Sequence, residues 1–251
     1  MEGRSLERER YKRHLILPDV GEEGQEKLKN GRVLVVGAGG LGSPVCLYLA
    51  AAGVGTIGIA DFDRVDISNL QRQVLYCEKD VGKRKAEAAA ERLRQMNSTL
   101  KVLTYGDGVT KENISQIIED YDVIVDASDN FRTRYLLSDA CVRMGKPDVY
   151  GAICEFSGQV TVFTKDGPCL RSLSPDEPET EVPEASGFGV LGAIPGVIGC
   201  IQAAEVLKLL LGTGDSLVGR MLFVDLKSMN FDEMEIGANP RCTCASFHRL
   251  I

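Results

Sequence analysis

Residues 32–42, R-V-L-V-V-G-A-G-G-L-G, join a short apolar run to a glycine-rich turn. The first five have the length and the β-branched content of a buried parallel strand. The other six match the pattern G-x-G-x-x-G, and a predicted helix at 44–52 and a predicted strand at 56–60 follow. The order strand, glycine turn, helix, strand predicts a βαβ unit that binds a nucleotide at the helix N-terminus.

The glycines of the turn and the acid after the second strand are the first predicted nucleotide contacts. Gly37 permits the tight turn, Gly39 and Gly40 let the backbone approach a phosphate or a ribose, and Gly42 completes the pattern. Asp61 ends the second strand, where an acid can hold ribose hydroxyl groups. Because the motif does not choose between ATP and NAD, an NAD-dependent oxidoreductase stays open as an alternative.

Strands and helices continue to alternate after this unit. Helices are predicted at 83–97, 113–120, 132–144 and 195–211, and strands at 101–105, 121–126, 148–152, 159–163 and 221–225. This alternation predicts an α/β fold with a doubly wound, mostly parallel, Rossmann-like sheet. Apolar and polar residues alternate at 159–163, which predicts additional antiparallel strands in the second half of the sheet.

The 251 residues are predicted to form one domain with four parts. These are an N-terminal helical arm at 1–30, a nucleotide-binding part at 31–165, a mobile loop at 172–186, and a C-terminal helix and strand part at 187–251. The loop is assigned because this segment is rich in acidic residues and proline and has no periodicity.

Composition indicates a globular chain whose partners are neither nucleic acid nor a membrane. The net charge of −7 argues against nucleic acid as the main partner. Apolar runs are too short to span a bilayer, and the charged residues 1–13 lack the apolar segment of a secretory signal. Several of the eight cysteines lie in apolar helical stretches, which fits a reduced chain, so a cytoplasmic location is expected.

Polar and charged residues follow two of the predicted strands. After Asp61 come Asp63, Ser68, Asn69, Gln71, Arg72 and Lys85, and after strand 121–126 come Asp129 and Asn130. Doubly wound sheets bind ligands at the carboxyl ends of their strands, so we expect these side chains around one crevice. Arg72 offers a planar fork and Lys85 a point charge to a triphosphate, and Asp129 offers a carboxylate to Mg²⁺. A phosphate-handling enzyme needs such a set, whereas a dehydrogenase does not.

These motifs resemble those of the MoeB/ThiF/HesA branch of the ubiquitin-activating enzyme superfamily. The matching stretches, in chain order, are R-Y-K-R-H-L-I-L, G-A-G-G-L-G, D-F-D, S-N-L-Q-R-Q, G-K-R-K, D-A-S-D-N, G-Q-V-T-V-F and P-G-V-I-G. They extend from Arg10 to the Asn239-Pro240 stretch, which is nearly the whole chain. S-N-L-Q-R-Q followed by D-x-x-D-N is far more selective than the glycine pattern alone.

The resemblance implies nucleotide contacts by position. Gly40 and Asp61 would contact the nucleotide and its ribose, and residues 68–72 would line the triphosphate. Asp129 would hold Mg²⁺, with Asn130 at the same edge of the sheet.

The resemblance also implies that cationic side chains take part in catalysis and that the protein is a homodimer. Lys85, rather than Lys83, matches the family lysine because it lies three residues after Gly82. Arg13 would reach the γ-phosphate from the other subunit. The predicted helix at 195–211 is apolar nearly all round, which suits burial in the core or at a subunit interface.

The activity that the resemblance implies is ATP-dependent adenylation of a small ubiquitin-like, β-grasp sulfur carrier of the MoaD or ThiS type. The carrier's C-terminal Gly-Gly carboxylate would attack the α-phosphorus and release pyrophosphate. A carboxylate is already the nucleophile at pH 7, so no general base is needed. A molybdopterin-type carrier is favoured. A non-catalytic adapter for a ubiquitin-like protein is the other alternative that stays open.

Two departures from the family pattern concern sulfur and zinc. Ala185 stands where many relatives carry a cysteine, and the chain ends at Ile251 without a rhodanese domain. We therefore expect the reaction to stop at the acyl-adenylate, with sulfur supplied by an external donor.

The zinc site of the family is altered in this sequence. Relatives use two C-x-x-C pairs, but here Ser172 replaces the partner of Cys169, and the second pair, Cys242 and Cys244, is one residue shorter. His248 is the candidate fourth ligand of a Cys₃His zinc site.

Overall fold

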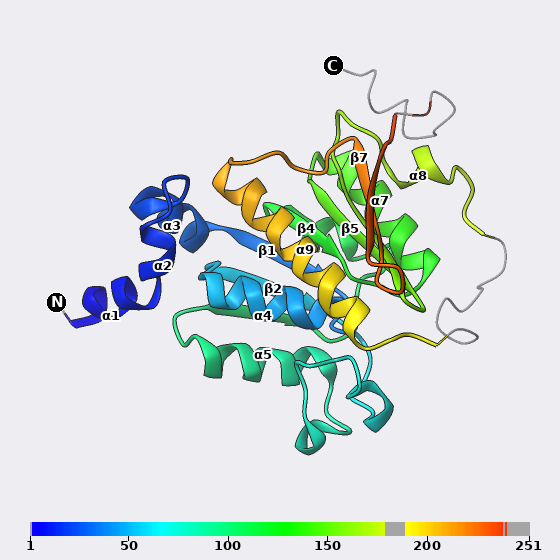
Figure 1. Cartoon of the computed structure of the whole chain (residues 1–251). Coiled ribbons are helices and arrows are strands. Elements are labelled where there is room, and N and C mark those ends of the chain that lie inside the picture. The colour runs from blue at the N-terminus through cyan, green and yellow to red at the C-terminus, as the bar shows by residue number, and fades with distance from the viewer. Residues whose placement is uncertain (1, 179–188, 238, 240–251) are drawn as a thin grey trace.

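The computed structural model describes residues 2–178, 189–237 and 239, and its strands form one sheet (Figure 1). The described strands are β1 (Arg32–Val36), β2 (Thr56–Ala60), β3 (Lys101–Tyr105), β4 (Val123–Asp126), β5 (Asp148–Cys154), β6 (Ser157–Phe163), β7 (Arg220–Asp225) and β8 (Asn230–Glu235). Their order is β3-β2-β1-β4-β5-β6-β7-β8. Pairing is parallel from β3 to β5 and antiparallel from β5 to β8. The predicted fold class, including its antiparallel second half, is confirmed.

Helices cover both faces of the parallel strands (Figure 1). The described α-helices are α1 (Glu2–Arg10), α2 (Lys12–Leu15), α3 (Gly21–Asn30), α4 (Gly42–Ala52), α5 (Lys85–Met96), α6 (Ile114–Glu119), α7 (Phe131–Met144), α8 (Leu170–Leu173) and α9 (Ala193–Leu211). Short 3₁₀ turns occur at η1 (Ile67–Asn69) and η2 (Glu78–Asp80). One core lies between the sheet and α4, α5 and α9, and a second lies beneath α6 and α7. Alternate residues of β1 enter the two cores: Val33 and Val35 the first, Leu34 and Val36 the second.

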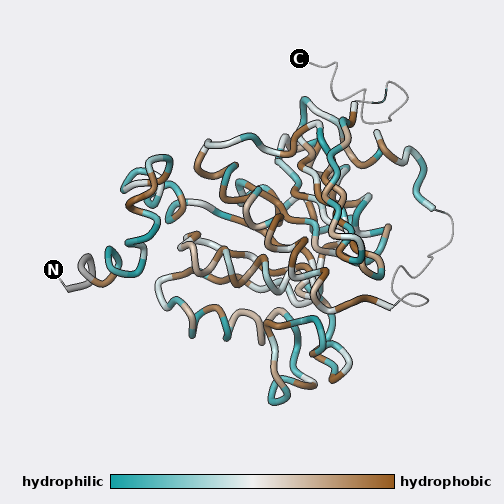
Figure 2. The backbone as a smooth tube through the Cα atoms, viewed as in Figure 1, coloured by the Kyte–Doolittle hydropathy of each residue, from teal (hydrophilic) through white to brown (hydrophobic). Residues whose placement is uncertain are grey.

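Helix α9 is apolar and long enough to cross a membrane by composition, but it packs on this sheet. Ile194, Ile198 and Val206 are fully buried, and Gln202 donates from Nε2 to the carbonyl oxygens of Asp126 (2.8 Å) and Val149 (3.0 Å). Figure 2 shows hydrophobic residues along α9 and the neighbouring α4. These contacts are those of a core helix that crosses β4 and β5.

Three segments differ from the sequence-based prediction. Strand β8 was not predicted, because every residue in it is exposed and no buried face marks its sequence. Helix α5 begins at Lys85 rather than Lys83, because backbone hydrogen bonds to Val65 and Asp80 hold residue 83 in the preceding turn. The predicted loop at 172–186 overlaps the last two residues of α8, and its residues 179–186 lie outside the described part of the chain.

Candidate active site

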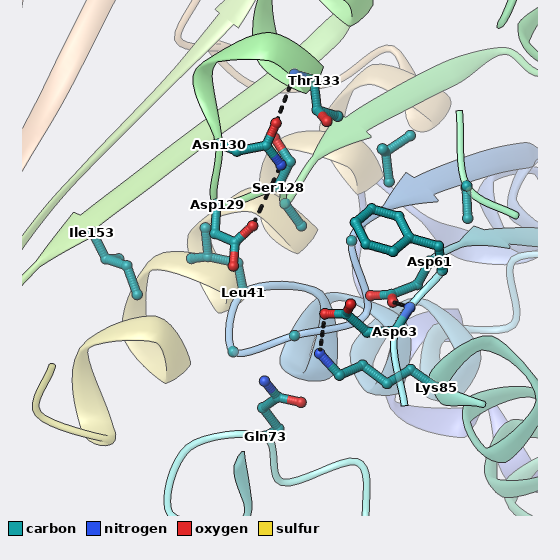
Figure 3. Close-up of a pocket in the computed structure, with 18 of the residues that line it drawn as sticks. Leu41, Asp61, Asp63, Gln73, Lys85, Ser128, Asp129, Asn130, Thr133 and Ile153 are labelled. Carbon is teal, nitrogen blue, oxygen red and sulfur yellow. Dashed lines mark hydrogen bonds and ion pairs between the residues drawn. The ribbon is translucent and has the colours of Figure 1, made fainter. Parts of the chain in front are cut away.

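A cavity of about 310 Å³ opens at the carboxyl ends of β1, β2 and β4 (Figure 3). The glycine turn, the segments after β2 and η1, the start of α5 and the start of α7 all contribute to its lining. Ten of the residues predicted to bind nucleotide lie here: Gly37, Gly39, Gly40, Asp61, Asp63, Gln71, Arg72, Lys85, Asp129 and Asn130. The strand order therefore brings the two predicted polar segments to one crevice, and their binding roles stay predictions.

The glycine turn fits tightly between β1 and α4. Gly37 has φ 96°, a conformation that favours glycine, and a Cβ there would collide with the carbonyl group of Ala127. A Cβ on Gly42 would collide with the carbonyl oxygen of Gly37, so Gly42 serves the packing of the turn and does not line the cavity. Helix α4 begins here without a side-chain cap, so its N-terminus is available to a phosphate.

Asp61 is held rigidly at the end of β2. Its Oδ2 accepts from the backbone N–H of Ala38 (2.7 Å) and its Oδ1 from that of Asp63 (2.8 Å). Burial raises the pKa of Asp61, while Lys85 and the two backbone donors act in the opposite direction. Each carboxylate oxygen can accept a further hydrogen bond, which suits ribose hydroxyl groups.

Lys85 places a buried positive charge in the cavity. The residue is 6% exposed, and its Nζ lies 3.0 Å from Oδ2 of Asp63, an ion pair visible in Figure 3. Lys83, in contrast, is exposed and pairs with the buried Asp80 and the exposed Glu91. Arg72 supplies a second cation, held by a hydrogen bond from Nη1 to the carbonyl oxygen of Ser68 (3.3 Å).

The segment after β4 presents an exposed carboxylate to the same cavity. Asn130 caps α7 by accepting from the N–H of Thr133 (2.9 Å), and Asp129 lies beside it (Figure 3). Mg²⁺ binds through one or two carboxylates together with phosphate oxygens and water. The side chain of Asp129 fits that use, although the described residues contain no group of three His, Cys, Asp or Glu residues that could form an all-protein metal site.

Besides Gly42, three predicted residues do not line the cavity. Ser68 and Asn69 bond to Asp66 in a capping box that forms η1, which occupies the side-chain oxygen of Asn69. Arg13 is exposed on α2. Tyr11, two residues earlier, packs against Gly53 at the C-terminal end of α4, about 16 Å along that helix from the glycine turn.

Two residues that the sequence interpretation missed also line the cavity, Gln73 and Arg134. Arg134 is 3% exposed and donates to the hydroxyl of Tyr150 (3.1 Å) and to the carbonyl oxygen of Ser128 (3.1 Å). Gln73 is the second glutamine of S-N-L-Q-R-Q, and that motif was the available signal for it.

The predicted zinc ligands lie mostly outside the described residues, which do not include Cys242, Cys244 and His248. Cys169 is buried at the start of α8, and its Sγ lies 3.6 Å from Oγ of Ser172. The zinc site therefore stays a prediction.

Two buried carboxylates lie under the segment that carries Asp129. Asp126 and Asp148 are each 1% exposed, and neither oxygen of Asp148 has a hydrogen-bond partner within the described chain. Burial is the largest cause that raises the pKa of each; mutual repulsion adds to it for Asp148, and Arg134 opposes it for both. The buried thiol of Cys141 faces the same pair, and the positive charge of Lys146 acts on that thiol.

Replacing Asp148 with asparagine is expected to stabilise the protein at neutral pH. Burial gives Asp148 a higher pKa in the folded protein than in the unfolded chain. Its contribution to stability is fully present below the unfolded-state pKa and is lost as the pH rises through the folded-state pKa. Melting curves between about pH 4 and pH 8 should therefore decline less for Asp148→Asn than for the wild type, with a gain of a few degrees at pH 7. Asp166→Asn, in an exposed turn, is the matched control. An unchanged pH slope in Asp148→Asn would contradict this.

The sequence model of the ThiF family matches residues 11–245 of this chain. The chain belongs to the ThiF family. Among curated relatives of this ThiF-family chain is the Haloferax volcanii "SAMP-activating enzyme E1", 51% identical over 235 residues that cover 93% of this chain and 87% of the relative. Another is the Thermus thermophilus "Sulfur carrier protein adenylyltransferase", 50% identical over 243 residues that cover 94% and 90%.

Longer relatives and a solved structure extend the comparison. The maize "Adenylyltransferase and sulfurtransferase MOCS3-1" is 48% identical over 237 residues, and the ThiF-family chain spans 93% of its own length but 51% of that relative. E. coli MccB solved with MccA-N7isoASN superposes with a TM-score of 0.82 at 24% identity, covering 94% of this chain and 74% of that one. At that identity the likeness concerns the fold alone.

Proposed function

We propose that this ThiF-family chain is an ATP-dependent adenylyltransferase that activates the C-terminal glycine carboxylate of a small ubiquitin-like sulfur carrier. The observation that carries the proposal is the cavity, in which Arg72, Lys85 and Asp129 surround a glycine turn at a helix N-terminus. Adenylyltransferase is the activity in the names of the Thermus and maize relatives, which are 50% and 48% identical to this chain. Both observations favour adenylation over the oxidoreductase and adapter alternatives.

The reaction needs positioning and charge more than proton transfer. An oxygen of the carrier's carboxylate forms a bond to the α-phosphorus, and the bond from that phosphorus to the bridging oxygen of the β-phosphate breaks. The products are the acyl-adenylate and pyrophosphate. Arg72 and Lys85 offset the negative charge that moves to the leaving group, and the carboxylate is ionised without a general base.

Mg²⁺ is part of the proposal, with Asp129 as its protein ligand. When bound, the ion would neutralise phosphate charge. Asp129 is exposed at the cavity, whereas Asp63 is paired with Lys85. That difference favours Asp129 as the ligand.

We further propose a homodimer in which Arg13 serves the partner's cavity. In its own chain α2 lies at the far end of α4 from the glycine turn, so Arg13 needs a second subunit to reach a nucleotide. Partly exposed apolar side chains of α9, among them Val197 and Ile201, offer a surface for that contact.

The dimer is testable by mixing two inactive variants. Arg13→Ala and Lys85→Ala should each lose activity, and co-refolded mixtures should regain a fraction of it, because one of the two sites in a mixed dimer is intact. Sedimentation should show a dimer. A monomer that is fully active would contradict the proposal.

The pathway is proposed by analogy. A molybdopterin-type carrier is favoured, with the acyl-adenylate as the product, sulfur from an external donor and a cytoplasmic location. Ala185, which stands where many relatives carry a cysteine, lies outside the described residues.

Nucleotide-dependent melting separates the three candidate functions. ATP with Mg²⁺ should stabilise the folded protein and so raise its melting temperature. At a free ATP concentration one hundred times the dissociation constant, the free energy of unfolding should rise by about 2.7 kcal/mol. NAD should raise it if the chain is an oxidoreductase, and neither nucleotide should do so for an adapter. Stabilisation by NAD but not by ATP would refute adenylation.

A further inference from the structure

Gln73 is buried in the wall of the cavity beside the glycine turn. The residue is 4% exposed and follows η1, where its backbone N–H donates to the carbonyl oxygen of Asn69 (2.9 Å). A Cβ built on Gly39 would lie 3.6 Å from Nε2 of Gln73, so the amide covers that glycine. Figure 3 shows the Gln73 side chain on the same side of the cavity as Lys85.

The amide of Gln73 has no partner within the described part of the chain. Its Oε1 is shielded from solvent and accepts no hydrogen bond, and the described hydrogen bonds include none from Nε2. Flipping the side-chain amide exchanges the positions of its nitrogen and its oxygen. In either orientation a buried polar atom is left that needs a hydrogen-bond partner.

Two other buried glutamines show what a structural role looks like in this protein. Gln25 donates from Nε2 to the carbonyl oxygen of Ala52 (2.9 Å), and its Oε1 bonds to His14 (2.9 Å). The Oε1 of Gln202 also accepts no hydrogen bond within the described residues, but its Nε2 donates to two carbonyl oxygens and joins α9 to the sheet. Gln73 makes no such bond and is the one of the three that lines the cavity. Its amide is therefore placed for a ligand rather than for the fold.

The surroundings define the chemistry of that ligand. Gly39 lies next to the N-terminus of α4, and the charged groups of Arg72 and Lys85 line the same cavity. A phosphate placed there meets a positive helix end and two cations. A neutral N–H donor fixes the orientation of an oxygen without adding charge.

We propose that the side-chain amide of Gln73 donates a hydrogen bond to a non-bridging phosphate oxygen of the nucleoside triphosphate above Gly39. The proposal rests on the proposed adenylation and adds a residue that orients the polyphosphate. Because the amide meets phosphate and not the base or ribose, it contributes to the binding of ATP and not to that of adenosine.

The test compares ATP and adenosine binding by the full chain carrying Gln73→Met, which keeps the length of the side chain and removes the amide. We expect the dissociation constant for ATP to rise about 10-fold to 100-fold, as for loss of a hydrogen bond to a charged group. Affinity for adenosine should not change. The melting temperature without nucleotide should stay the same or rise, because a buried polar group without a partner has been removed.

Further variants separate this role from a structural one. Gln73→Glu should weaken ATP binding at least as much, because a carboxylate repels phosphate. Gln95→Met, on the exposed face of α5, is the control and should bind ATP as the wild type does. Unchanged ATP affinity in Gln73→Met would overturn the proposal, as would equal weakening of ATP and adenosine together with a lower melting temperature. A wild-type chain that binds no ATP would instead overturn the proposed function itself.

Discussion

Replacing Lys85 with alanine is expected to lower the rate of ATP–pyrophosphate exchange by about 100-fold or more, the cost of removing one charge that stabilises a transition state. The Lys85 side chain is 8% exposed, whereas that of its partner Asp63 is 52% exposed. Water can therefore hydrate Asp63 in the variant, and we expect the fold to persist. Circular dichroism and melting curves check that the loss is one of activity.

Lys83 offers a matched control two residues away. It carries the same charge but is exposed outside the cavity, where it pairs with Asp80 and Glu91. Lys83→Ala should exchange at close to the wild-type rate. Equal losses in the two variants would show that general surface charge, rather than the buried lysine, supports the reaction.

Gly42→Ala is expected to lower the melting temperature by about 6–12 °C and to abolish ATP binding at the temperature of the assay. The new Cβ would overlap the carbonyl oxygen of Gly37 and lie 2.9 Å from its carbonyl carbon. Backbone atoms cannot swing aside as a flexible side chain can, so the turn between β1 and α4 must open. A penalty of about 3 kcal/mol for such overpacking gives this shift in a domain of this size.

The control for Gly42→Ala is Gly237→Ala, where a Cβ would meet no atom of the described residues within 4 Å. Its melting temperature should stay within about 1 °C of the wild-type value. A Gly42→Ala protein that melts and binds ATP as the wild type does would contradict the tight packing of the glycine turn.

The regular spacing of apolar residues along the sequence made much of the fold predictable. The strand at 101–105 was predicted with the bounds that β3 has, and the alternation at 159–163 indicated the antiparallel β6. Strand β8 was not predicted, because its side chains are all exposed and its position depends on pairing with β7. A strand without a buried face lacks the alternation of apolar and polar residues that marks a strand in the sequence.

The direction of side chains in irregular segments of the site was harder to predict from the sequence than the positions of its residues. Asp61 and Asp129 follow strands β2 and β4, Lys85 begins helix α5, and the parallel sheet brings the three positions together. Asn69, in contrast, bonds locally to the backbone of Asp66, which competes with a role in the cavity. Sequence alone could not show that Gln73, rather than the exposed Gln71, turns its side chain into the protein.

The measurement that tests adenylation most directly is isotope exchange between pyrophosphate and ATP, with a small ubiquitin-like carrier ending in Gly-Gly added or omitted. Adenylation of the carrier predicts exchange that requires the carrier, Mg²⁺ and Lys85, and that disappears when the carrier's last glycine is removed. Carrier-independent exchange, or none with any such carrier in a protein that binds ATP, would contradict it.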